Sequence, residues 1–204
     1  LNDLEVKNVS GYVLDLRSNP GGLLESSIDI SRQFIDKGVI VSTLSKDGLR
    51  ETKRGNGKAL TNKPLIVLVN EGSASASEIV SGAIRDNNRG KLVGKKTFGK
   101  GLVQSMRTLV DGSGLTVTVA KYLTPNGTDI NKFGIIPDIE VRMNINPILQ
   151  REIGTRKDKQ YRTGEQELLK IIKRTKLISS FKPNSVNLLE VFKKKDNNLL
   201  YSLN

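Results

Sequence analysis

The sequence predicts an α/β fold, a twisted sheet with flanking helices, from three observations. Short apolar runs that contain β-forming residues occupy positions 11–17, 65–70 and 91–95, as buried strands do. Apolar residues recur at helical spacing between them, in residues 23–34 and 74–87. The resulting strand–helix–strand alternation favours parallel pairing of the strands.

The composition is that of an ordinary globular protein. The chain has 204 residues, of which 36% are apolar and 19 are glycines. This length suffices for one large domain, or for one domain with an appendage. Aromatic residues make up only 4% and tryptophan is absent, so aliphatic side chains must supply most of the core.

The first part of the chain contains two predicted strands and a helix. Residues 11–17 (GYVLDLR) form the first strand, and SNPGG at 18–22 is a turn by composition. A helix follows at 23–34, and residues 38–45 (GVIVSTLS) form the second strand. The polar, glycine-containing segment 46–58 then forms either a hairpin or a flexible surface loop.

The middle of the chain repeats this alternation. The apolar run 65–70 (LIVLVN) predicts a strand, and residues 74–87 predict a helix. Further strands are expected at 91–95, 115–124 and 135–141, the last two joined by a PNGTD turn. The helix rests on one apolar stripe with the spacing i, i+3, i+4, i+7 and i+8, which consists of Ala76, Ile79, Val80, Ala83 and Ile84.

Beyond residue 144 the hydrophobic pattern weakens. A helix is expected at 165–177, and the Asn- and Lys-rich residues 178–204 offer few packing signals. We therefore divide the chain into a core at 1–145, a helical segment at 146–177 and a loosely packed tail at 178–204.

The net charge of +12 comes from 33 basic and 21 acidic residues and could suit nucleic acid, anionic lipid or an acidic protein. The lysines are spread along the chain without an aromatic-rich basic stripe, so we expect no nucleic-acid partner.

The absence of cysteine excludes disulfides and thiolate metal sites. No apolar run approaches the roughly 20 residues of a membrane helix. Because neither an initiator Met nor a signal peptide is visible, we expect a fragment whose targeting segment lies upstream.

The chain also lacks histidine, so it cannot supply a Ser-His-Asp triad or a Cys-His pair. A serine nucleophile would need another base, and an uncharged lysine amine can take that role. Ser73, Ser75 and Ser77 lie where a predicted strand gives way to a helix. Free backbone N–H groups and the helix dipole favour a developing oxyanion at such a junction. The structural alternative is that Ser75 and Glu78 form a capping box.

Lys100 lies between Gly99 and Gly101, which allow the backbone to approach other groups closely. A lysine acts as a base only when it is uncharged, and burial disfavours the charged form. Gln104 can accept a hydrogen bond from the amine without favouring that charged form, as a carboxylate would. The structural alternatives are a surface turn for Lys100 and an exposed strand position for Gln104. The two side chains can meet only if the backbone turns near Gly101.

Four segments resemble the carboxyl-terminal processing peptidases, the Ser-Lys family that includes the tail-specific protease. LDLRSNPGG is similar to the glycine turn of the family, and SASASEI is similar to its nucleophile motif. RDNNRGKLVGKKTFGKGLVQ resembles its lysine segment, and YLTPNGTDINKFGIIPDIEV resembles its closing motif. The four segments span about residues 10–142 in order. The resemblance implies a ClpP/crotonase-like core.

The resemblance also implies the roles of individual residues. Ser75, the middle serine, would be the nucleophile, and Lys100, which lies 25 positions further (100 minus 75), would be the general base. Gln104 matches the glutamine that assists the lysine. The N–H groups of Gly21, in the glycine turn, and of Ala76 match the oxyanion hole.

Asp86 matches a position that is sometimes assigned to a charge relay in the catalytic site. Eleven residues of straight helix would place it about 16 Å from Ser75, too far for contact. We expect Asp86 to hold Arg85, Arg89 or the following loop instead.

The reaction implied by the resemblance is peptide-bond hydrolysis through an acyl-enzyme, without a metal or a cofactor, on a polypeptide cut near its free C-terminus. The family works in the periplasm or the thylakoid lumen. For a photosynthetic source, the implied substrate is the precursor of a membrane-bound photosystem II reaction-centre protein. A PDZ domain normally precedes this core, and none fits before Gly11. Two alternatives stay open: a non-catalytic peptide-binding module of the same fold, and a basic nucleic-acid-binding domain.

Overall fold

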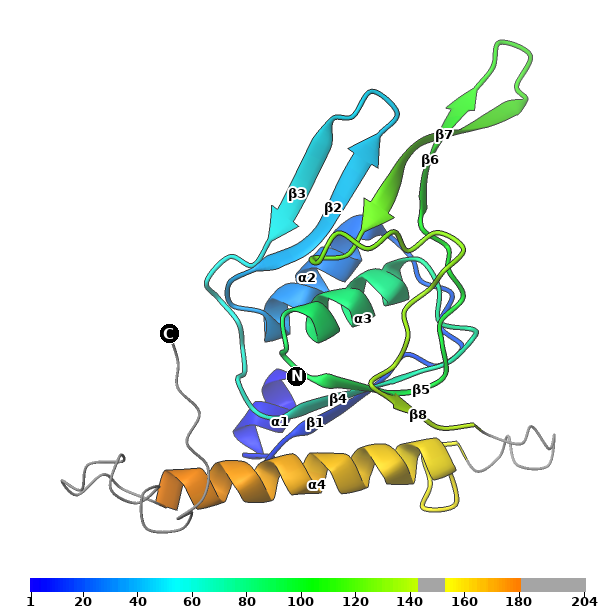
Figure 1. Ribbon diagram of the computed structural model, residues 1–204. Coiled ribbons are helices and arrows are strands. Elements are labelled where there is room, and N and C mark those ends of the chain that lie inside the picture. Colours follow the sequence, from blue (N-terminus) through cyan, green and yellow to red (C-terminus); the bar gives the residue numbers. More distant parts are fainter. Residues whose placement is uncertain (143–152, 181–204) are drawn as a thin grey trace, which may run out of the picture. The chain divides into compact units, whose positions relative to one another are not determined.

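The computed structural model describes residues 1–142 and 153–180. Residues Leu1–Ile172 form one compact unit, and a second unit begins at Lys173. The first unit contains two four-stranded sheets with helices packed on them (Figure 1). It therefore extends beyond residue 145, where the sequence pattern placed the end of the core.

The first sheet is parallel throughout, as the strand–helix alternation predicted. Its strand order is β1-β4-β5-β8, and each neighbouring pair is parallel. The four strands are β1 (Tyr12–Asp15), β4 (Leu65–Val69), β5 (Lys91–Gly94) and β8 (Ile139–Glu140). The carboxyl ends of β1 and β4 consequently meet at one edge of the sheet, where the turns that follow them can carry a site.

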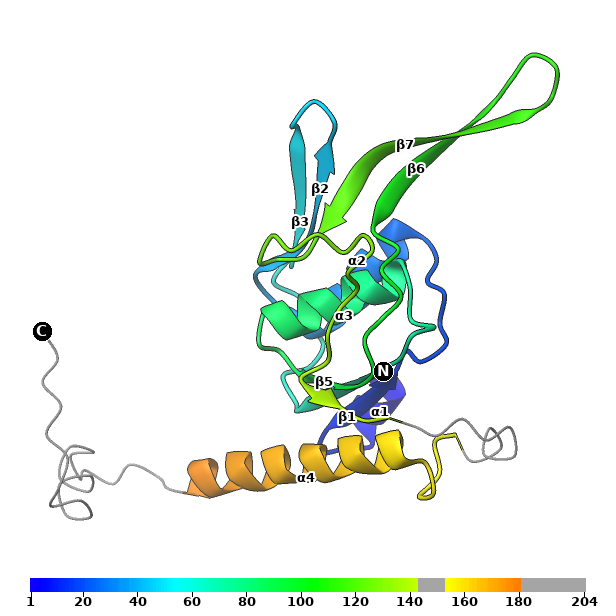
Figure 2. The same cartoon turned by 45° about the vertical axis from the view of Figure 1, so that its right-hand side comes forward.

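Two helices, α2 (Leu24–Phe34) and α3 (Ala76–Asp86), lie side by side between the two sheets in both views (Figures 1 and 2). Their buried apolar side chains pack on one face of β4, and the packing is almost wholly aliphatic. The β4 residues in this core are Leu65, Val67 and Val69. The apolar stripe predicted for α3 is buried along its whole length.

The long helix α4 (Lys159–Ser180) begins on the other face of the parallel sheet. Leu168 packs there against Ile66 and Leu68, the alternate residues of β4. A Cβ on Gly164 would lie 2.9 Å from a Leu68 methyl carbon. The start of α4 is therefore part of the core and is not a loose appendage.

The second sheet is antiparallel, with the order β3-β2-β7-β6. Its strands are β2 (Val39–Ser45), β3 (Arg50–Arg54), β6 (Leu102–Thr108) and β7 (Gly114–Leu123). The segment 46–58 thus forms a hairpin, one of the two predicted alternatives. The sequence reasoning missed β6 and the antiparallel pairing of β7 with β2 and β6.

Smaller differences separate the predicted elements from the observed ones. A short helix, α1 (Asn2–Val6), was not predicted, and the strand expected at 135–141 is reduced to β8. The helix expected at 165–177 is longer at both ends. The tail beyond residue 180 lies outside the described residues. None of the helices in the described part of the chain combines the length and the apolar character needed to cross a bilayer.

Candidate active site

Ser75 is the residue immediately before α3, at the predicted strand–helix junction. Its φ of 55° and ψ of −117° are unusual for a residue with a side chain, and such a conformation costs about 1–3 kcal/mol. Ser73 and Ser77 are buried, whereas Ser75 is only half-buried. The Ser73 hydroxyl is occupied by donation to the Leu16 carbonyl oxygen at 2.7 Å. The middle serine is therefore the most exposed of the three.

A single buried carboxylate joins the start of α3 to the lysine segment. Glu78 is fully buried. Its Oε2 accepts hydrogen bonds from the N–H groups of Ser75 at 2.9 Å and Lys100 at 2.8 Å. Its Oε1 accepts from the Gly99 N–H at 2.7 Å and the Thr97 hydroxyl at 2.5 Å. The predicted capping box is present, and the same side chain also fixes the segment that carries Lys100.

These bonds bring the proposed nucleophile and base close together. Because the backbone nitrogens of Ser75 and Lys100 bond to the same oxygen, they lie at most 5.7 Å apart, the sum of 2.9 and 2.8 Å. The N–H of Phe98 also donates to the Ser73 carbonyl oxygen at 3.0 Å. The four-carbon side chain of lysine can span such a separation.

The Lys100 side chain itself is exposed, and no hydrogen bond joins it to Ser75 within the described residues. The shielding from water expected for a lysine base is therefore absent from this structure. Gly99 and Gly101 are buried, and a Cβ on Gly101 would lie 2.3 Å from the backbone nitrogen of Asn131. The backbone on both sides of Lys100 is therefore buried against another loop, whereas its side chain is exposed.

Gln104 lies in β6 and is exposed. The β6–β7 register shifts between Val103 and Gln104. Val103 packs against the core, whereas the Gln104 side chain, directly beyond this irregularity, is exposed. In the described part of the chain, no hydrogen bond links Gln104 to Lys100. The arrangement matches the exposed strand position that was the structural alternative, and the assisting role of Gln104 stays a prediction.

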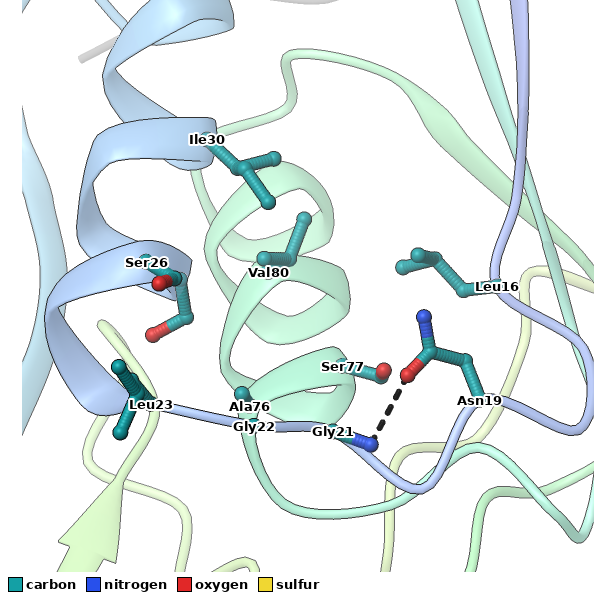
Figure 3. A pocket seen from close by; sticks show the side chains of 11 residues that line it. Leu16, Asn19, Gly21, Gly22, Leu23, Ser26, Ile30, Ala76, Ser77 and Val80 are labelled. Atoms are coloured by element: carbon teal, nitrogen blue, oxygen red, sulfur yellow. Dashed lines mark hydrogen bonds between the residues drawn. The ribbon is translucent and has the colours of Figure 1, made fainter.

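Gly21 packs directly against the start of α3. Its φ is +95°, and a Cβ on it would lie 2.7 Å from the Ala76 nitrogen and 2.9 Å from the Ser75 Cβ. The Ala76 N–H is in the first turn of α3, where no intrahelical acceptor exists. The backbones of Gly21 and Ala76 therefore both border Ser75. The Gly21 N–H donates to the Asn19 Oδ1 at 2.9 Å (Figure 3).

A small pocket of about 100 Å³ opens beside Gly21 and Ala76, between the starts of α2 and α3 (Figure 3). Apolar side chains predominate among its lining residues, with Asn19 at the Gly21 side. The apolar lining residues include Leu16, Leu23, Ile30 and Val80. The pocket has room for a small apolar side chain next to Ser75.

Gly21→Ala is expected to lower peptide cleavage by about 10²-fold, a typical effect of losing an oxyanion donor. The added methyl group would overlap the Ala74 carbonyl oxygen, 2.6 Å away, as well as Ala76. Steady-state kinetics on an unfolded polypeptide would measure the loss. The matched control is Gly114→Ala, because a Cβ at Gly114 meets nothing within 4 Å and the residue lies in β7, outside the pocket. Equal activity of the two variants would show that the close approach of Gly21 is not needed.

Asp86 is the last residue of α3, at the opposite end from Ser75. Its buried carboxylate pairs with Arg85 at 2.9 Å and accepts a hydrogen bond from the Asn126 N–H at 3.1 Å. Arg89 donates to backbone carbonyl oxygens instead. The expectation that Asp86 holds Arg85 is confirmed. Because Asp86 and Ser75 lie at opposite ends of α3, Asp86 is too far from the proposed nucleophile to contact it.

Sequence reasoning missed two side chains that contact the site. Asn19 carries a recognisable signal, since Asn before Pro often bonds to a backbone N–H two residues further on. Thr97 carries none, because its hydroxyl joins Glu78 to the Ile135 N–H through contacts distant in sequence. Among the described residues, no group of three or more His, Cys, Asp or Glu side chains could hold a metal ion.

Comparisons with known proteins identify the family and the fold. The architecture is that of the ClpP/crotonase-like α/β proteins, as expected. The chain belongs to peptidase family S41, whose model matches residues 1–141. The family resemblance noted in the sequence is thus confirmed.

Three relatives illustrate the similarity. The chain is 52% identical over 164 residues to the carboxyl-terminal-processing protease of Synechocystis sp., covering 80% of this chain and 38% of that protein. It is 44% identical over 146 residues to the chloroplastic C-terminal processing peptidase of Tetradesmus obliquus, covering 71% of this chain and 32% of that protein. The solved structure of a photosystem II D1 C-terminal processing protease matches with a TM-score of 0.67 and 41% identity, over 76% of this chain and 41% of that one. The chain spans between 32% and 41% of the length of these relatives.

Proposed function

We propose that this chain is the catalytic part of a serine endopeptidase that cleaves polypeptides near their C-termini. The observation that carries the proposal is the shared oxygen of Glu78, which holds the backbones of Ser75 and Lys100 within 5.7 Å, the sum of 2.9 and 2.8 Å. Membership of peptidase family S41 supports it. The relatives named as C-terminal processing proteases support the position of the cut.

The proposed reaction proceeds in two halves. The uncharged Lys100 amine removes the proton from the Ser75 hydroxyl, whose oxygen attacks the peptide carbonyl carbon. The N–H groups of Gly21 and Ala76 stabilise the oxyanion of the tetrahedral intermediate. The lysine then gives its proton to the leaving nitrogen, and the C–N bond breaks to give an acyl-enzyme. A water molecule, deprotonated by the same amine, hydrolyses the ester and restores Ser75. The scheme uses no metal and no cofactor.

Two local changes must accompany binding of the substrate. The peptide has to cover Lys100, because burial disfavours the charged amine and the side chain is exposed in this structure. The carbonyl oxygen of the peptide has to replace the Asn19 Oδ1 as the acceptor of the Gly21 N–H. Gln104 would orient the amine after the first of these changes.

The pocket beside Gly21 suggests which residue precedes the cut. A side chain there would be small and apolar, given the volume of about 100 Å³ and the lining. The relatives are chloroplastic or bacterial, which fits a periplasmic or thylakoid-lumen enzyme. The name of the solved relative says that it processes the C-terminus of the photosystem II D1 protein. By analogy, the proposed substrate of this chain is a membrane-associated protein with a free C-terminus.

The decisive experiment incubates the protein with an unfolded polypeptide and detects new C-termini by mass spectrometry. Wild type should produce them, and Ser75→Ala should not. Binding of the peptide without cleavage by either protein would favour a non-catalytic peptide-binding module. Cleavage by both would point to a contaminating protease. Salt-sensitive retention of DNA without cleavage would favour a nucleic-acid-binding domain.

A further inference from the structure

Arg17 and Asp158 form a buried ion pair outside the proposed dyad. The Arg17 Nη1 lies 2.7 Å from the Asp158 Oδ2, and the two side chains are 6% and 1% exposed. The guanidinium also pairs with Asp15 at 2.6 Å and donates to the Gln160 Oε1 at 3.2 Å. It is therefore held on one side by its own segment and on the other by the start of α4.

The Asp158 carboxylate is itself fixed in direction. It accepts hydrogen bonds from the Gly154 N–H at 2.9 Å and from the Tyr161 N–H at 3.0 Å, the latter in the first turn of α4. Burial acts against the charged form, but these two N–H groups and Arg17 together hold the pKa of Asp158 below its usual value. A carboxylate bound from three sides is a rigid anchor for the guanidinium.

Arg17 in turn begins the turn that ends at the proposed oxyanion hole. In that turn, the Ser18 N–H donates to the Asn70 Oδ1 at 2.7 Å. The Asn19 carbonyl oxygen accepts from the Ala74 N–H at 3.0 Å. The turn then reaches Gly21, which packs against the start of α3 (Figure 3). The residues between Arg17 and Gly21 are thus clamped between the buried ion pair and the nucleophile.

We propose that Asp158 is a positioning residue of the peptidase: it fixes Arg17, and Arg17 fixes the turn that aims the Gly21 N–H at the substrate carbonyl. This inference rests on the proposed function. Asp158 itself touches neither the substrate nor Ser75. The start of α4 then belongs to the catalytic apparatus, although the sequence pattern assigned it to a separate helical segment.

A purely stabilising role is the competing explanation. Removing two charges from water opposes most of their mutual attraction, so a buried ion pair is weak evidence for stability. The ion pair also fixes the direction of the Arg17 side chain, and this is what separates a positioning role from a stabilising one. A shift of about 1 Å in a catalytic group lowers turnover by about 10²-fold. The two explanations differ in kcat measured on fully folded protein.

The test compares Asp158→Asn with wild type, since asparagine keeps the size and also caps helices well. Cleavage of an unfolded polypeptide is measured well below the melting temperature of each variant, with Ser75→Ala as the blank. We expect kcat to fall between tenfold and about 10²-fold, with KM within about twofold of wild type. The Gly21 amide resonance should also shift in a ¹H–¹⁵N spectrum, a readout that needs no activity.

Glu167→Gln is the matched control. Glu167 ties α4 to the core through Lys91 at 2.7 Å without touching Arg17, so kcat and the Gly21 resonance should stay at their wild-type values. An unchanged kcat and resonance in Asp158→Asn, with only a lower melting temperature, would overturn the proposal. Equal losses of kcat in both variants would do the same, because they would indicate a general tether.

A second variant guards against failure to fold. Arg17→Met combined with Asp158→Leu removes both charges together, which proteins often tolerate in a buried site. The proposal expects a folded protein with lowered kcat and a shifted Gly21 resonance; wild-type values would reject it. If wild type cleaves no more than Ser75→Ala, the proposed function fails, and the Gly21 resonance alone decides whether Asp158 positions the turn.

Discussion

Lys100→Arg is expected to lower kcat/KM for peptide cleavage by about 10⁴-fold or more, as loss of a catalytic base does in serine peptidases. A guanidinium stays protonated at any pH at which proteins fold, so it cannot accept the proton of Ser75. The substitution nevertheless keeps the positive charge and most of the length. The double variant with Ser75→Ala should lose no more than either single variant, because the two residues act in one step. Steady-state cleavage of an unfolded polypeptide measures all three.

The matched control for this prediction is Lys96→Arg, four residues earlier in the same segment. Lys96 is also exposed, and it has no place in the proposed mechanism, so its substitution should leave the rate within about twofold. The Lys100 variant should fold normally, since the Lys100 side chain is exposed. A Lys100→Arg protein that kept more than a tenth of wild-type activity would show that the lysine acts through its charge and not as a base.

Glu78→Gln should lower kcat by about 10³-fold and reduce the free energy of unfolding by about 3 kcal/mol. Both carboxylate oxygens accept hydrogen bonds, and each of them binds at least one backbone N–H. A glutamine NH₂ group cannot accept a hydrogen bond. In either orientation of the amide, the NH₂ group would therefore face a backbone N–H group that has lost its acceptor. The segment carrying Lys100 should then move away from Ser75. Kinetics together with thermal unfolding monitored by circular dichroism would measure both effects.

Glu71→Gln provides the comparison for this second prediction. Glu71 is 54% exposed and pairs with Lys95 at 2.9 Å on the surface, and exposed pairs of this kind contribute about 0–1 kcal/mol. Its loss should change stability by no more than that and leave the rate unaffected. If Glu78→Gln behaved like Glu71→Gln, the buried carboxylate could not be what holds the two catalytic segments together.

The elements that the sequence predicted well carry their signal locally. β4 is buried on both faces and therefore appears in the sequence as a continuous apolar run. One face of α3 is buried against the core, which gives the apolar stripe with helical spacing. Parallel pairing followed from the strand–helix alternation alone.

The elements that were missed depend on distant partners. β6 (LVQSMRT) is mostly exposed and forms by pairing with β7, so its residues show little hydrophobic pattern of their own. The strand expected at 135–141 is cut short in a stretch that contains Pro137, which has no N–H to donate. Ile135 is nevertheless buried in the hydrophobic core, and its N–H donates to the Thr97 hydroxyl.

The candidate site divides in the same way. The family resemblance implied Ser75, Gly21 and Ala76, and the structure brings these three backbones together. The role of Glu78 beyond capping could not be predicted, because three of its four donors lie about 20 residues further along the chain. Exposure of the Lys100 side chain could not be predicted either, since the segment around it packs on a loop about 30 residues further along the chain.

The full burial of Glu78 also determines how the site responds to electrolyte. Dissolved ions weaken attractions between solvent-exposed charges and hardly affect groups inside the protein. Concentrated salt should therefore weaken surface ion pairs such as Lys95–Glu71. The distance between the backbone segments that carry the Ser75 hydroxyl and the Lys100 amine should stay the same. A change in turnover with ionic strength would then report on the capture of polypeptides by the strongly basic exterior, not on the chemistry at the centre.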